Sequence, residues 1–224
     1  MTRIFAIDIK NGEVVKSFAG ARSNYRPLTI KKKDFSDAEK IIELVSHKLG
    51  INNFYLADLD SIQKDSNNWC LIKRLVNKYK DNNFYIDSGF NRKSKLEKFK
   101  RYINNKCFPE NLNIVVGTEN IKNKKTLQHI CQNTKSFISL DFYKTKPEWF
   151  FSGNMTNEGY ILMFINRVGG RGVDWKLLTK IRKYLPPYKC LVAGGIKYNG
   201  DILKINRMGY AGTIISTIIH SELI

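Results

Sequence analysis

Two aspartates at the ends of largely apolar stretches are the residues of this chain best suited to acid–base chemistry. Asp8 follows the apolar residues 4–7, and Asp141 follows the similar stretch 137–140. Apolar runs bounded by turn residues are typical of buried strands, so each carboxyl group is expected at the C-terminal end of a strand. Two carboxyl groups on opposite sides of one substrate can act as general acid and general base. Either aspartate alone would equally well cap the loop that follows it, but the matched pair favours catalysis.

Small residues at the ends of other expected strands form a second candidate set. Their backbone N–H groups could cradle phosphate, as the loops after the last two strands do in many barrels. The set comprises Gly89, Gly117 and Thr118 in the first half of the chain, and Gly194, Gly195, Ser216 and Thr217 in the second. Each glycine by itself could serve only a turn. The symmetric placement of the set predicts a substrate with a phosphate at each end.

Strand and helix patterns alternate along the chain and must position these residues. Strands are expected at residues 3–10, 54–58, 84–89, 113–118, 136–141, 160–166, 188–195 and 212–217. Helices are expected up to residue 49, with Ser36 or Asp37 as the cap, and at 67–79, 96–103, 126–131, 175–184 and 202–208, while residues 19–33 read as a polar loop. This alternation in 224 residues predicts the α/β class and a (β/α)8 TIM barrel. An open doubly wound sheet is the alternative, but it would usually carry GxGxxG after its first strand, which this chain lacks.

The two halves of the chain look like copies, which predicts a duplicated half-barrel. Asp8 matches Asp141, residues 88–90 match 194–196, and residues 115–118 match 214–217. We therefore expect one barrel domain over residues 1–224, with half-barrels at about 1–132 and 133–224. The first and fifth strands of an eight-stranded barrel are diametrically opposed. Asp8 and Asp141 should then face each other across the C-terminal mouth, where barrel active sites lie.

The fifth crossover and the last helix are expected to be short. About eighteen residues join the fifth and sixth strands, which is little for a crossover helix with its loops, and only residues 218–224 follow the last strand. Apolar strand faces would then need another cover. Trp149, Phe150 and Phe151 are the expected cover, and a second subunit is the alternative, which would make the protein a homo-oligomer.

The composition indicates a cytoplasmic protein without a nucleic-acid or membrane partner. The formal charge is +18, but the basic residues are spread over expected outer helices, so a solvated surface and compositional drift explain the charge better than a nucleic-acid site. No apolar run reaches the roughly 18 residues of a membrane span, and no signal sequence is apparent. The four cysteines are scattered without a CxxC pair, so neither a disulfide nor a metal site is expected.

Five segments together resemble the histidine-biosynthesis barrel family: residues 6–12, 57–60, 115–118, 139–142 and 193–196. That family comprises the isomerase of phosphoribosylformimino-aminoimidazole carboxamide ribotide and its sister cyclase. The resemblance implies that Asp8 is the general base and Asp141 the general acid of an Amadori rearrangement. The acid would open the aminoaldose ring to a Schiff base, and the base would remove the proton at C2. The resemblance also implies a phosphorylated small-molecule substrate and no metal or redox cofactor.

Several positions depart from the isomerase pattern. Three glycines and an arginine are usual after strand three, whereas this chain has residues 87–91, Asp-Ser-Gly-Phe-Asn, and the acid Asp87 is expected to repel a phosphate there. Met163 and Phe164 replace a Thr-Asp pair in strand six, Val168 stands in place of the aspartate of Arg-Asp-Gly, and Ser216 replaces a glycine. The altered strand-three motif and residues 20–27, which include the further candidate Arg22, resemble a side branch of isomerase-related proteins from methanogens and methylotrophs.

Three functions remain open at this point. The first is an intramolecular isomerase of a phosphorylated aminosugar. The second is a lyase or cyclase on the same scaffold, acting on a singly phosphorylated ligand such as another sugar or triose phosphate. Asp58 and Asp87 would contribute to its site, and one-carbon cofactor biosynthesis is a candidate pathway. The third is a degenerate barrel that binds nucleic acid or protein through its basic surface. It ranks last, because binding alone gives no reason to keep both aspartates.

Overall fold

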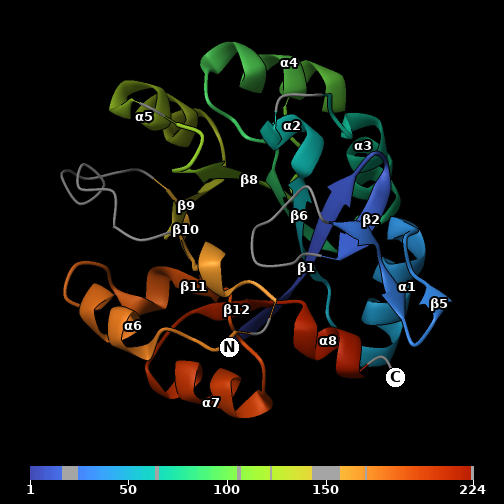
Figure 1. Ribbon diagram of the computed structural model, residues 1–224. Helices are drawn as coiled ribbons and strands as arrows, with labels where there is room; N and C mark the ends of the chain where they lie inside the picture. The colour runs from blue at the N-terminus through green and yellow to red at the C-terminus, as the bar shows by residue number, and fades with distance from the viewer. Residues whose placement is uncertain are drawn as a thin grey trace.

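Eight parallel strands form a closed barrel, as the alternating pattern predicts (Figure 1). The computed structural model describes residues 1–16, 25–63, 66–104, 107–121, 123–142, 157–169 and 171–222. In ring order the strands are β1 (Thr2–Lys10), β6 (Asn53–Asp58), β7 (Asn83–Asp87), β8 (Leu112–Gly117), β9 (Ser136–Asp141), β10 (Gly159–Met163), β11 (Cys190–Ala193) and β12 (Gly212–Ile215). Parallel pairing of β12 with β1 closes the ring, so the fold is a (β/α)8 barrel rather than an open doubly wound sheet.

The helices lie around the outside of the ring, between successive strands (Figure 1). They are α1 (Ala38–Leu49), α2 (Leu59–Gln63), α3 (Trp69–Lys78), α4 (Lys93–Ile103), α5 (Lys124–Asn133), α6 (Trp175–Ile181), α7 (Asn199–Arg207) and α8 (Thr217–Glu222), with 3-10 turns η3 (Ile165–Arg167) and η4 (Pro187–Lys189). The last helix, α8, has six residues and is short, as expected. Residues 143–156 of the fifth crossover, Trp149, Phe150 and Phe151 among them, fall outside the described residues. No helix in the described ranges is both long and apolar enough to cross a membrane.

Helix α1 illustrates why the local sequence forms these elements. The Asp37 carboxylate accepts hydrogen bonds from the Glu39 and Lys40 amides and caps the N-terminus. Gly50 ends the helix with φ +61°, a left-handed conformation that glycine adopts without strain. Apolar side chains at helical spacing, from Ala38 to Val45, face the strands and are buried. Both cap positions agree with the sequence-based expectation.

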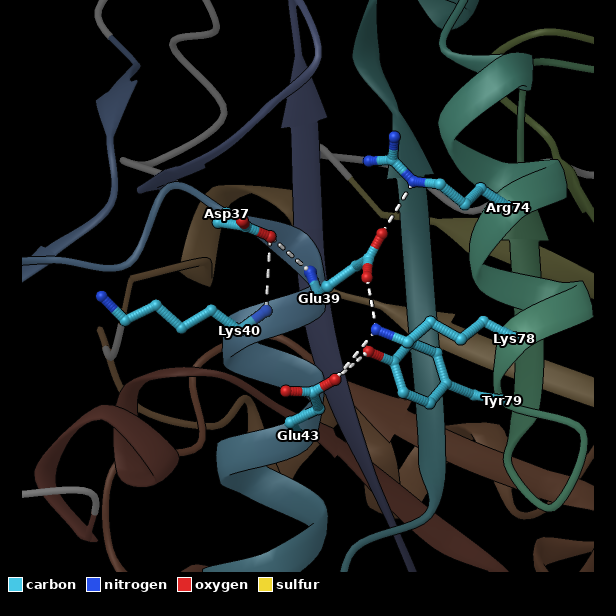
Figure 2. Close-up of polar contacts among 7 residues, drawn as sticks. All are labelled: Asp37, Glu39, Lys40, Glu43, Arg74, Lys78 and Tyr79. Carbon is cyan, nitrogen blue, oxygen red and sulfur yellow. Dashed lines mark hydrogen bonds and ion pairs between the residues drawn. The ribbon is translucent and has the colours of Figure 1, made fainter.

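Charged side chains join α1 to α3 on the surface (Figure 2). Glu39 pairs with Arg74 at 2.7 Å and also with Lys78, which contacts Glu43 at 3.0 Å. The Tyr79 hydroxyl donates to Glu43 at 2.6 Å. Because the Arg74, Lys78 and Glu43 side chains are well exposed, each ion pair is expected to add little to the stability of the fold.

The core has two layers, set by the alternation of side chains along each strand. The larger cluster lies between strands and helices and includes Ile7, Ile42 and Phe84. The smaller one lies inside the barrel and includes Ile4, Tyr55 and Val115. On β1 this alternation sends Ile7 and Ile9 outward, and it leaves Asp8 on the inner face with Ile4 and Ala6.

Part of the expected polar loop 19–33 is strand. After a turn at residues 11 and 12, β2 (Glu13–Lys16) pairs antiparallel with β1, and β3 (Arg26–Pro27) pairs with β2. β4 (Thr29–Ile30) pairs with β5 (Lys33–Asp34). The prediction is wrong there because these two-residue strands show no periodicity of their own. They are held by tertiary contacts, with Val14 and Leu28 buried against the barrel helices and bonded backbone to backbone at 2.8 Å.

Five strands end earlier than predicted, and one helix was missed. β7 ends at Asp87 rather than at residue 89, and β8 ends at Gly117 rather than at residue 118. β10 ends at Met163, and η3 follows it. β11 ends at Ala193, because Gly194 and Gly195 have φ of +89° and +86°, outside the strand region. β12 ends at Ile215, and α8 begins at Thr217. The missed helix is α2, which has only five residues, too few to show a helical period in the sequence.

Candidate active site

A pocket opens at the C-terminal ends of the barrel strands, where active sites of this fold lie. It has about 900 Å³ of empty space, with the solvent at its mouth included. Its lining includes Ala6, Asp8, Tyr25, Tyr55, Ala57, Asp87, Glu119, Asp141, Met163, Ala193, Gly194, Gly195, Ile214, Ser216 and Thr217. Four of these residues are acidic, and none of the described lining residues is lysine or arginine.

Asp8 and Asp141 lie on opposite sides of this pocket. Four steps around the ring separate β1 from β9 in either direction, so the two strands are diametrically opposed. Asp8 is half-buried two residues before the end of β1, next to Ala57 of β6, and Asp141 is the last residue of β9. Both side chains line the same pocket, which is the arrangement expected from the strand order.

Several hydrogen bonds fix the Asp141 carboxyl group. Its Oδ2 accepts from the Glu119 amide at 3.0 Å and the Thr118 hydroxyl at 3.2 Å, and its Oδ1 accepts from the Ser139 hydroxyl at 2.7 Å. Removal from water raises the pKa of Asp141 to about 7, and the nearby charges of Asp87 and Glu119 add to the rise, while the hydrogen bonds oppose it. A carboxyl group with this pKa is partly protonated near neutral pH, as a general acid requires.

Tyr55 and Asp87 form a buried pair in the pocket. The Tyr55 hydroxyl donates to Oδ2 of Asp87 at 3.1 Å, and the Gly89 amide donates to Oδ1 at 3.0 Å. Burial raises the pKa of Tyr55 well above its usual range, and the charges of Asp87, Asp141 and Asp8 add to this, so the phenol stays protonated. The sequence analysis missed Tyr55. Its inward position on β6, two residues before Ala57, is the signal that could have found it.

The inner-facing aspartates come from alternate strands of the ring. β1, β7 and β9 present Asp8, Asp87 and Asp141, and the fourth strand of this series, β11, presents Ala193. Alternate strands contribute the side chains of one layer in barrels of this kind. Asp8 therefore lies opposite Asp141, and Asp87 lies opposite Ala193 and the glycines that follow it.

The second-half phosphate candidates all line the pocket. Gly194 and Gly195 follow β11, and Ser216 and Thr217 follow β12. A side chain could not be added at either glycine, because a Cβ on Gly194 would lie 2.5 Å from the Phe164 carbonyl oxygen, and one on Gly195 would overlap the Gly172 carbonyl group. Among the described residues, no hydrogen bond donated by the Gly194 or Gly195 amide is found.

The first-half candidates lie differently. Gly89 does not line the pocket, and it packs against Ile62. Gly117 separates two carboxylates, since a Cβ there would lie 3.1 Å from Asp141 Oδ2 and 3.6 Å from Asp87 Oδ2. The Thr118 hydroxyl donates to Asp141 and accepts from its amide. These three residues shape the acidic side of the pocket and do not mirror the arrangement of Gly194 and Gly195.

The remaining candidates are Asp58 and Arg22. Asp58 is fully buried outside the pocket lining, where its carboxylate accepts from the Ser61 amide, the Ser88 hydroxyl and both the amide and side chain of Asn68. It therefore organises the loops around α2 rather than contacting a ligand. Arg22 lies outside the described residues. Over the described positions, no cluster of three or more His, Cys, Asp or Glu side chains has the arrangement of a metal site.

Comparison with protein families matches residues 3–224 to the family described as histidine biosynthesis protein. The match spans nearly the whole chain and all eight barrel strands. The chain belongs to the histidine biosynthesis protein family. This family includes isomerase and cyclase barrel enzymes, and membership agrees with the closed barrel and its pocket. A search of curated proteins found no match.

Proposed function

We propose that this family member is an intramolecular aldose–ketose isomerase of the Amadori type that acts on a phosphoribosyl amine. The observation that carries the proposal is the pair Asp8 and Asp141, which face one pocket from opposed strands. The raised pKa of Asp141 supports a division of roles, with Asp141 as acid and Asp8 as base.

The proposed reaction returns both protons at the end of each turnover. Protonated Asp141 donates to the ribose ring oxygen, the bond from C1 to that oxygen breaks, and a Schiff base forms at C1. Asp8 removes the proton from C2, and the electron pair of the C2–H bond moves into the C1–C2 bond to give an enolamine. Asp8 then returns its proton to C1, while the C2 hydroxyl gives its proton to Asp141. The product is the aminoketose.

The phosphate of the substrate is proposed to bind at Gly194 and Gly195, beside Ser216 and Thr217. The unused amides of the two glycines support this, since loops after the last two strands often bind phosphate in TIM barrels.

The test is turnover by the purified protein and its variants Asp8→Asn and Asp141→Asn. Conversion of phosphoribosylformimino-aminoimidazole carboxamide ribotide would be followed by NMR, with growth of a histidine auxotroph lacking the isomerase as a second readout. We expect each variant to lose about 10²- to 10⁴-fold in rate, the contribution typical of one acid or base. Asp81→Asn, at an exposed position outside the pocket, is the matched control. Full activity in both pocket variants would contradict the proposal.

Asp87 favours a second candidate, a lyase or cyclase that acts on another sugar or triose phosphate. An additional carboxylate held by Tyr55 in the same pocket could serve as a further base. The mass of the product separates the candidates, because an isomer keeps the substrate mass, a cyclisation with dehydration loses one water, and a lyase gives two fragments.

A further inference from the structure

A second groove lies on the outside of the barrel, between α1 and the hairpin of β4 and β5 (Figure 1). It has about 1360 Å³ of empty space, with open solvent included, and none of its described lining residues lines the active-site pocket. Ile30, Phe35 and Leu44 form the apolar part of its lining. The cationic part consists of four lysines, two from the hairpin and two from α1: Lys31, Lys33, Lys40 and Lys48.

The positive charge of this groove is not neutralised by its own residues. Glu43 is the one acid among the described lining residues, and it accepts from Lys78 at 3.0 Å and from the Tyr79 hydroxyl at 2.6 Å, on the side of α1 that faces α3 (Figure 2). The neighbouring Asp34 and Asp37 do not line the groove, and their carboxylates accept backbone amides. Over the ranges that the structure describes, no ion pair or side-chain hydrogen bond is found for three of the lysines, Lys31, Lys33 and Lys48. The groove therefore offers unpaired cations beside apolar side chains.

The tip of the hairpin holds lysines where the backbone favours other residues. Lys31 and Lys32 form the two-residue turn between β4 and β5, and their φ angles are 47° and 64°. A turn with positive φ at both central residues strongly favours Asn-Gly, because most side chains are strained in the left-handed region. Among the described residues other than glycine, only Asn11 shares this conformation. Since backbone strain of this kind gathers at functional sites, the two lysines point to a use for their charge.

The dimensions and chemistry of the groove restrict what can occupy it. From Lys40 to Lys48 it follows about 12 Å of α1, which matches about four residues of extended chain. A second copy of the protein is disfavoured, because it would bring the same formal charge of +18. A nucleic acid would stack its bases on open aromatic faces, but the Phe35 ring is half-buried and the Lys40 ammonium group lies 5.5 Å from its centre. The apolar side chains of Ile30 and Leu44 suit an apolar side chain of a peptide instead.

We propose that the groove between α1 and the β4–β5 hairpin binds an acidic segment of a partner protein. The carboxylates of that segment pair with the four lysines, and one of its apolar side chains packs against Ile30, Phe35 and Leu44. This binding function is separate from the pocket at the barrel mouth, so it does not depend on the proposed isomerase activity.

Fluorescence anisotropy at low salt tests the proposal with four labelled probes. The main probe is a short peptide of alternating glutamate and leucine. In two matched peptides glycine replaces leucine or lysine replaces glutamate, and a short oligothymidylate serves as the nucleic acid. We expect the glutamate–leucine peptide to bind about tenfold more tightly than each of the others, and its affinity to fall as salt screens the charges.

Charge variants locate the binding site. Lys31→Glu combined with Lys33→Glu should weaken binding of the glutamate–leucine peptide about tenfold. Lys93→Glu combined with Lys98→Glu changes the net charge equally at exposed positions of α4, and it should alter the affinity by less than about threefold. Lys31→Asn combined with Lys32→Gly gives the turn its preferred residues, so it should weaken the peptide without lowering the melting temperature.

Three outcomes would overturn the proposal. Equal losses in the hairpin and α4 charge variants would show that the peptide responds to net charge and not to the groove. Oligothymidylate binding as tight as that of the glutamate–leucine peptide would assign the groove to nucleic acid. Failure of the folded protein to bind the glutamate–leucine peptide at low salt would remove the binding function altogether.

Discussion

The charge of Asp87 should tune the acidity of Asp141, and the geometry gives the size of the effect. The Oδ2 atoms of both carboxylates lie within 3.6 Å of the point where a Gly117 Cβ would be, so they are no more than about 7 Å apart. Two unit charges at 7 Å interact with about 2 kcal/mol at an effective dielectric constant of about 20, and with about 0.6 kcal/mol in bulk water. One pKa unit corresponds to about 1.4 kcal/mol.

We therefore expect Asp87→Asn to lower the pKa of Asp141 by about one unit from its value of about 7. The sign follows because Asp87 disfavours the ionised form of Asp141, and removing that charge makes ionisation easier. A value well above that of an ordinary aspartate should remain, since burial is the larger cause of the shift.

The assay is a ¹³C NMR titration of the aspartate carboxyl groups in the protein without substrate, with Asp141→Asn used to assign the signal. The control, Asp81→Asn, should leave the pKa of Asp141 unchanged. An unchanged or higher pKa of Asp141 in Asp87→Asn would refute the reasoning, because it would mean that the two carboxylates do not interact through their charges.

Three other outcomes follow from named contacts. Between the usual aspartate pKa and about 7, folding takes up a proton at Asp141, so the contribution of Asp141 to stability falls as pH rises through that window. At pH 8, urea unfolding should therefore find Asp141→Asn more stable than the unaltered protein. Equal stability of the two proteins at pH 8 would contradict the raised pKa of Asp141. Gly50→Ala should cost about 1 kcal/mol in thermal unfolding, because φ is +61° and no atom lies within 4 Å of an added Cβ, so only backbone strain acts. Glu39→Gln should lower the free energy of unfolding by less than about 1 kcal/mol, and by less still at 1 M salt, because the partners Arg74 and Lys78 are exposed and screened. A larger loss that does not depend on salt would contradict this.

Much of the fold follows from the sequence because its signals are local. Each buried strand is a short apolar run between turn residues, and helix α1 carries its own caps in Asp37 and Gly50. Strand order around a closed ring then places the first and fifth strands opposite each other, so the sequence is enough to predict that Asp8 lies opposite Asp141.

Only the tertiary structure decided which of the other candidates share the pocket. Asp58 and Asp87 both end strands, yet Asp58 is bound by the α2 loops, and Asp87 is held in the pocket by Tyr55, a partner 32 residues away in the chain. Gly89 and Gly195 look equivalent in sequence, yet the Gly89 amide is used by Asp87. The physical reason is that backbone and side-chain periodicity is a property of neighbouring residues, whereas burial and hydrogen-bond partners are set by strands that meet only in the closed barrel.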